Sequence, residues 1–155
     1  MNASTDSTPE QDLGVFIAIV RDYFATVGGA AAELLEPSLE WTPPARLETT
    51  GYMPVSGGIN GWIGLSLPDS MLCGLLERMG EPVRDEETCR DLAAEMASVI
   101  TGNARAHFGP RLLISPPLSA RHTDPDPELP QPRISLKLPF RWQGDQGFLL
   151  VACTS

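Results

Sequence analysis

The chain has 155 residues, 42% of them hydrophobic, which is enough for a single domain with its own core. The 20 acidic residues outnumber the 11 basic ones and give a formal net charge of −9, so we expect no nucleic-acid-binding surface. No apolar run is long enough to span a membrane and the N-terminus lacks the regions of a signal peptide, so we predict a cytoplasmic protein without a membrane segment.

The first 44 residues predict a tail, a helix and an edge strand. Residues 1–8 are small and polar, so we expect a disordered tail before a single domain over residues 9–155. A helix is predicted from about Glu10 to Val27, because apolar residues recur there at helical spacing and a glycine pair follows. In residues 30–44 three prolines interrupt the apolar pattern, which favours an irregular edge strand.

The next segment predicts a β-hairpin. Its arms are Thr49–Ser56 and Ile59–Leu67, joined at a glycine pair. Gly61 and Gly64 lie within the second arm, and they leave gaps where another group is expected to pack closely. A short helix is predicted to follow, between Pro68 and Gly80.

Residues 85–109 predict one long helix around which the rest of the chain is organised. Asp85 is a good N-cap, and Gly109 followed by proline ends the helix. One face is apolar and is expected to pack on the core: Leu92, Met96, Val99, Ile100 and Phe108.

A second face of this helix carries the candidate functional residues: Asp91, Glu95, Ser98, Gly102 and Arg105. Gly102 has no side chain, so another surface has room to approach the helix there. Asn103 is predicted to turn back toward the core and to satisfy buried backbone groups.

The C-terminal third predicts more strands. A short strand is expected in residues 112–117, a proline-rich loop in residues 123–132, and an alternating strand over Arg133–Phe140. In that strand Ile134, Leu136, Leu138 and Phe140 are predicted to point inward, and Arg133, Ser135 and Lys137 outward. A turn at residues 144–147 then precedes a last strand, Phe148–Cys153.

These elements predict an α+β fold, a mostly antiparallel sheet with helices on one face and solvent on the other. We expect the strands at residues 59–67 and 133–140 to be neighbours under the long helix, because each has an apolar face that needs the same cover.

The three cysteines, Cys73, Cys89 and Cys153, are far apart and read as reduced thiols, and no metal-ligand spacing occurs. Ser98 and His107 are nine residues apart, on opposite sides of the helix, so they do not form a nucleophile and its base.

The spacing of Asp91, Glu95 and Gly102-Asn103-Ala104 resembles the signature helix of the chemotaxis phosphatases CheC, CheX and FliY. The glycine-rich strand before a helix that ends in Met79-Gly80 is similar to the same family. Only one copy of the Glu-centred motif is present, which makes the chain similar to CheX-type members and implies a CheX-like domain, one site per protomer and a homodimer. This chain has Ser98 where the family pattern has asparagine.

The resemblance implies hydrolysis of the phospho-aspartate on a CheY-type response-regulator receiver domain. Glu95 would dock the receiver, and Ser98 would stand at the position that orients the attacking water, so Glu95 and Ser98 are the expected catalytic residues. Asp91, Glu95, Gly102 and Arg105 would bind the partner. No cofactor is expected on this chain, and magnesium is expected on the receiver.

Two function classes remain open. The first is a phosphatase that is weak because the Ser98 hydroxyl reaches less far than a side-chain amide. The second is a catalytically impaired receiver-binding adaptor, or a dimeric scaffold, in two-component or chemotaxis signalling.

Overall fold

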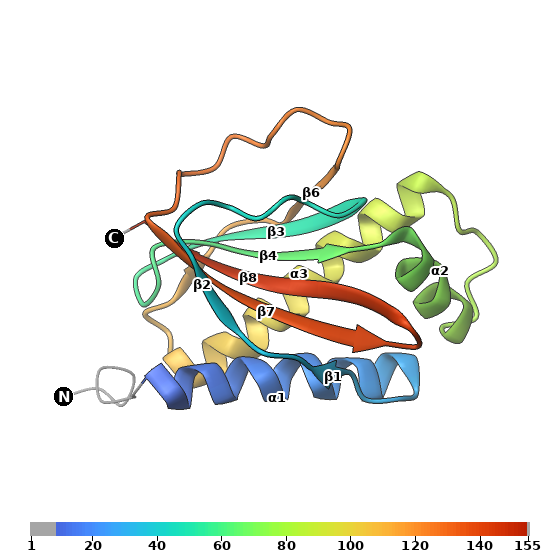
Figure 1. Ribbon diagram of the computed structural model, residues 1–155, viewed down its shortest axis with the longest axis horizontal. Coiled ribbons are helices and arrows are strands. Elements are labelled where there is room, and N and C mark those ends of the chain that lie inside the picture. The colour runs from blue at the N-terminus through green and yellow to red at the C-terminus, as the bar shows by residue number, and fades with distance from the viewer. Residues whose placement is uncertain (1–8, 155) are drawn as a thin grey trace.

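Strands of the described chain pair into one antiparallel sheet, and three helices pack on one of its faces (Figure 1). The computed structural model describes residues 9–154, so the predicted disorder of residues 1–8 lies outside the described residues. The helices are α1 (Pro9–Gly28), α2 (Asp69–Arg78) and α3 (Glu86–Phe108). The strands are β1 (Glu33–Leu34), β2 (Ser38–Glu40), β3 (Thr49–Ser56), β4 (Gly61–Leu67), β5 (Leu113–Ile114), β6 (Leu118–Arg121), β7 (Ile134–Trp142) and β8 (Asp145–Cys153). This architecture confirms the predicted α+β fold class.

The order of the strands differs from the prediction. The sheet runs β1-β7-β8-β4-β3-β5, with β2 also paired to β7 and β6 to β3. β8 lies between β7 and β4, and Leu149 pairs with Leu138 on one side and with Leu65 on the other. The expectation that residues 59–67 and 133–140 form neighbouring strands is therefore wrong, because the β7–β8 hairpin inserts its second arm between them.

The turn of that hairpin is shorter than expected. Gln143 and Gly144 have φ angles of 52° and 84°, and Trp142 pairs directly with Asp145. Such a two-residue turn with positive φ angles matches the twist of the flanking strands. The predicted turn at residues 144–147 is thus too late, and β8 already begins at Asp145.

The edges of the sheet are built from very short strands. β1 and β2 both pair with β7, which confirms an irregular edge strand within residues 30–44. At the other edge β5 occupies only part of the strand predicted at residues 112–117, and β6 was not predicted at all.

Local interactions fix α3 as the sequence indicated. The Asp85 carboxylate accepts a hydrogen bond from the Thr88 backbone N–H at 2.9 Å, and Gly109 ends the helix with a φ of 87°. Its buried face packs closely on β3, since a Cβ atom at Gly51 would lie 2.0 Å from the Ala93 carbonyl oxygen. Leu92, Met96, Ile100 and Phe108 are buried in the core between the helices and the sheet, as predicted.

The outer face of the sheet, away from the helices, is not solvated as expected. It carries a second apolar cluster of Tyr52, Trp62, Ala120, Phe148, Leu150 and Ala152, against which Leu129 of the proline-rich loop packs. The loop at residues 123–132 has no helix or strand, as predicted, and its residues from Asp126 to Pro132 form a wall beside Trp62 and Phe148 on this face. Ser135 accordingly points outward but is only 1% exposed, which corrects its expected exposure.

Candidate partner-docking face of helix α3

The outward face of α3 brings the predicted site residues together. Asp91, Glu95, Gly102 and Arg105 are exposed and Ser98 is half-buried, whereas Met96, next to Glu95, is fully buried. With 3.6 residues per turn, Glu95 and Ser98 lie one turn apart on the same side, about 4.5 Å along the helix axis. The prediction that Glu95 and Ser98 are accessible together, with Gly102 beside them, is confirmed.

The carboxylate of Glu95 is exposed and is not used in polar contacts within the described residues. No hydrogen bond or ion pair to its carboxylate occurs within residues 9–154, and the same holds for Asp91. The Glu95 carboxylate lies near Tyr23 of α1; burial first, and this negative charge second, raise the pKa of Tyr23 to about 12. The carboxylate of Glu95 is therefore available to an incoming cation.

Gly102 and Arg105 differ in how they could contact a partner protein. A Cβ atom placed on Gly102 would meet nothing within 4 Å, so a partner surface has room to come close to the helix. Arg105 is exposed, but its Nε donates to the Leu112 carbonyl oxygen at 2.9 Å. This bond holds the guanidinium near the end of α3, and its other N–H groups remain for contacts with a partner.

A groove between α1 and α3 extends this face in a direction that the sequence analysis missed. Its volume is about 450 Å³, and Glu95, Val99 and Asn103 form its α3 side. Val99 is 39% exposed and Asn103 is exposed, so both expected core positions are corrected. The remaining lining residues come from α1 and the end of α2: Ala18, Ile19, Asp22, Tyr23, Thr26, Val27 and Met79.

The path of α1 explains these two corrections. α1 meets α3 near its C-terminal end, where the Phe16 and Phe108 rings are 6.0 Å apart and Asp12 lies 3.1 Å from His107 Nε2. Farther along, the groove separates the two helices, so the flank of α3 that carries Val99 stays open. The spacing of Glu95, Val99 and Asn103 at i, i+4 and i+8 was the available sequence signal for this row.

Other kinds of site find no support in the described part of the chain. His107 is engaged with Asp12 and does not approach Ser98, as its spacing predicted. No group of three or more His, Cys, Asp or Glu side chains among residues 9–154 is arranged to hold a metal ion. No described helix combines the length and the apolar character that crossing a bilayer requires. Cys73, Cys89 and Cys153 are free thiols.

Comparison with known proteins gives matches to one family model and to several solved structures. Residues 49–141 match the family model described as chemotaxis phosphatase CheX. No curated protein sequence matches the chain. A chemotaxis protein CheX from Desulfovibrio desulfuricans is 16% identical with a TM-score of 0.77, over 90% of this chain and 96% of that one.

Two further solved structures have the same fold. A CheC-like superfamily protein from Shewanella is 16% identical with a TM-score of 0.77, over 98% of both chains. The CheX chain of a CheX–CheY–BeF3–Mg²⁺ complex from Borrelia burgdorferi is 14% identical with a TM-score of 0.70, over 92% of this chain and 97% of that one. At such identities the likeness concerns the fold.

Proposed function

This chain belongs to the CheX family of chemotaxis phosphatases, and we propose that it acts on the phospho-aspartate of a CheY-type receiver domain. The observation that carries this proposal is the outward face of α3. Glu95, which is exposed and makes no ion pair within residues 9–154, stands one turn from Ser98, next to the open surface at Gly102. This face offers an anion for docking and a hydroxyl group for binding water.

Hydrolysis of a phospho-aspartate requires few catalytic groups from the phosphatase itself. An acyl phosphate is already activated, so a catalyst needs mainly to hold a water molecule in line with the phosphorus and to fix the two proteins in register. Glu95 would bind a cationic group of the receiver and orient the complex. The Ser98 hydroxyl would accept a hydrogen bond from the attacking water and donate one of its own, as far as its reach allows.

The groove beside this face is a second reason for a macromolecular partner. It joins apolar walls from Ile19, Val99 and Met79 with the carboxylates of Asp22 and Glu95. Such a surface suits a protein segment with an apolar side chain and a neighbouring cation. The complex of CheX with CheY among the structural neighbours supports a receiver as that partner. Magnesium would be bound by the receiver, and this chain would need no cofactor of its own.

The alternative function is a receiver-binding adaptor with little or no catalysis. The specific observation in its favour is Ser98, because a serine side chain is shorter than the amide found at this position of the family pattern and is half-buried here. A water misplaced by about 1 Å can cost on the order of 100-fold in rate. Docking through Glu95 and the groove would be unaffected by this loss.

We further propose that the protein is a cytoplasmic homodimer. The sheet ends at two short edges that carry exposed apolar side chains, with Leu39 and Trp41 62% and 75% exposed near one edge and Leu113 59% exposed at the other. Apolar edges of this kind favour pairing with another chain. Sedimentation equilibrium tests this proposal, and a mass of one chain across the micromolar range rejects it.

The central experiment follows the decay of a phosphorylated receiver, using receivers encoded by the same genome, with and without this protein. Faster decay at saturating protein supports the phosphatase. Binding without faster decay supports the adaptor. If no receiver binds in either its phosphorylated or its unphosphorylated form, both functions are rejected.

A further inference from the structure

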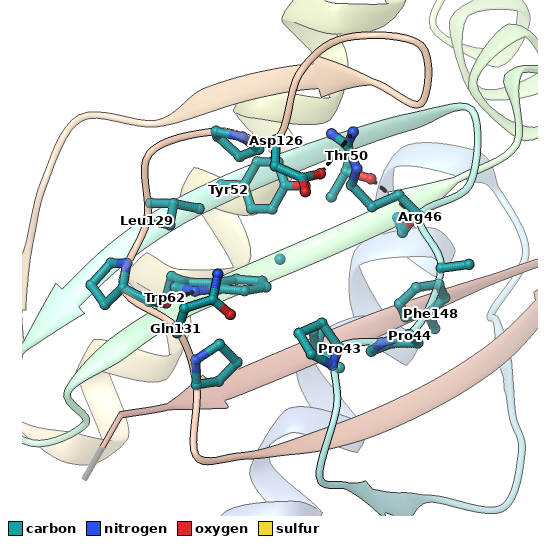
Figure 2. Close-up of a pocket in the computed structure, with 17 residues that line it drawn as sticks. Pro43, Pro44, Arg46, Thr50, Tyr52, Trp62, Asp126, Leu129, Gln131 and Phe148 are labelled. Atoms are coloured by element: carbon teal, nitrogen blue, oxygen red, sulfur yellow. Dashed lines mark hydrogen bonds and ion pairs between the residues drawn. The ribbon is translucent and has the colours of Figure 1, made fainter.

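A cavity of about 250 Å³ lies on the outer face of the sheet, opposite the helices (Figure 2). Strands β3, β4 and β8 form its floor, and two proline-containing segments, residues 43–46 and 126–132, form its walls. This cavity is separate from the docking face of α3, which lies on the other side of the sheet. It is smaller than the roughly 300–1,000 Å³ typical of pockets for drug-sized ligands, so a ligand of one or two rings suits it.

The floor of the cavity is a fixed aromatic surface. The Trp62 ring lies over Gly64, where an added Cβ atom would come within 2.9 Å of a ring carbon. Its Nε1 donates to the Pro130 carbonyl oxygen at 3.1 Å, and the Tyr52 ring meets it edge-on with a centroid distance of 5.3 Å. A tryptophan held in this way presents an apolar surface on which a planar ring can stack.

The polar end of the cavity contains one arginine, Arg46, whose guanidinium is only partly paired. Arg46 Nη2 donates to the Asp124 carbonyl oxygen at 3.0 Å and lies 3.2 Å from Asp126 Oδ1. Nη1 of the same side chain is buried and makes no hydrogen bond of good geometry among the described residues. Burial raises the pKa of the Tyr52 hydroxyl, and the guanidinium, which lies beside that hydroxyl, has a smaller and opposite effect on its pKa. A buried donor without a partner is costly, and a guanidinium group selects an anionic acceptor.

A hydroxyl pair adjoins this arginine. Ser66 Oγ accepts from the Leu47 backbone N–H at 2.7 Å and from Thr50 Oγ1 at 3.0 Å. One proton of this hydroxyl pair is used between the two oxygens, and the other is left as a further donor beside the cavity that both residues line. Figure 2 shows Arg46, Thr50 and Asp126 at one end of the cavity, with Trp62 and Phe148 farther along the floor.

We propose that this cavity binds a small aromatic monocarboxylate, with its ring on Trp62 and its carboxylate toward Arg46 and Ser66. The carboxylate supplies an acceptor for the Nη1 group of Arg46, and the ring buries against the aromatic floor. This inference does not depend on the proposed action on receiver domains.

The test is a titration followed through the indole N–H resonance of Trp62 in a ¹H–¹⁵N spectrum of the full chain. The probes are benzoate, phenylacetate and indole-3-acetate, each compared with its neutral amide, and acetate without a ring. We expect at least one acid to bind with a Kd of about 1 mM or below, and its amide roughly tenfold more weakly or worse. Acetate should cause no saturable shift.

Two variants with opposite expected effects sharpen the test. Arg46→Met should weaken binding of the acid by roughly tenfold or more and leave the amide unchanged, because it removes the cation. Asp126→Asn should strengthen binding of the acid, because Asp126 competes for the same guanidinium. Arg133→Met is the control for net charge, since Arg133 is exposed outside the cavity lining, and it should change little.

The proposal is overturned if no acid gives a saturable shift, or if acid and amide bind equally well. It is also overturned if Asp126→Asn weakens binding of the acid. The comparison of wild type with Asp126→Asn tests the proposal even if Arg46→Met fails to fold.

Discussion

The guanidinium of Arg90 on α3 donates to the carboxylate of Asp124, with 2.7 Å between Nη1 and Oδ2. Asp124 also accepts from the Arg121 backbone N–H at 2.8 Å, so it joins the start of the proline-rich loop to strand β6 and to the long helix. The loop at residues 123–132 is therefore hydrogen-bonded to α3, the helix that carries Glu95 and Ser98.

This contact should make stability depend on pH in the acid range. The hydrogen bond from Arg90, followed by the one from the Arg121 backbone, lowers the pKa of Asp124 from 3.8 to about 2. Because the folded-state pKa is lowered, the contact stabilises the protein above the unfolded pKa, and this contribution is lost as the pH falls from about 4 to about 2.

Urea unfolding at several pH values checks this prediction. The difference in free energy of unfolding between wild type and Asp124→Asn should be largest near neutral pH and should shrink across the range from about 4 to about 2. A difference that stays constant down to pH 2 would show that Asp124 does not titrate with a lowered pKa.

Ser98→Asn should raise phosphatase activity toward a receiver that the wild-type protein binds. The amide reaches farther than the hydroxyl and presents both a donor and an acceptor to water, which is worth roughly 1–3 kcal/mol of barrier. The measurement is single-turnover decay of the phosphorylated receiver at saturating protein. Equal and substantial activity in both forms would mean that serine suffices or that another group positions the water.

Glu95→Ala should weaken receiver binding, because it removes the exposed carboxylate that lies one turn from Ser98 on the docking face. We expect a loss of about tenfold in Kd, or about 1.4 kcal/mol, and a smaller dependence of the remaining affinity on salt. Glu87→Gln is the matched control, since Glu87 is exposed in the first turn of the same helix. Equal losses in the two variants would indicate a general effect of charge.

Gly102→Leu should change stability and binding in opposite directions. A side chain at Gly102 meets open space, and removing a glycine from a helix interior should raise the free energy of unfolding by about 0.5–1 kcal/mol. The same side chain should obstruct a partner that approaches the helix there. Gly14→Leu, at an exposed helical glycine with open space around it, should give a similar gain without affecting receiver affinity.

Gly51→Ala should destabilise the fold. Its Cβ atom would lie 2.0 Å from the Ala93 carbonyl oxygen, which is backbone and cannot rotate away. Separating α3 from β3 to relieve this clash should cost about 1–3 kcal/mol or more, measurable by urea unfolding. Unchanged stability would mean that α3 moves away from β3 at little cost.

Elements whose structure depends on neighbouring residues could be predicted from the sequence. The ends of α3 follow from the Asp85 cap and Gly109, and the β3–β4 hairpin follows from alternation around a glycine pair. The polar row from Asp91 to Arg105 faces outward because the helix period alone places it opposite Met96 and Ile100. The family resemblance, carried by the same helix, is confirmed by the match over residues 49–141.

The relations between distant segments depend on the packing of the whole chain and could not be predicted from local patterns. Strand β8 lies between β7 and β4 because long-range pairing selects the sheet order, which alternation within one strand does not encode. Val99 and Asn103 line a groove because α1 and α3 contact each other at Phe16 and Phe108 and leave a gap beside Val99. Trp62 is buried on the outer face beside Leu129 and Pro130, and burial by a separate segment leaves no periodic pattern in either sequence.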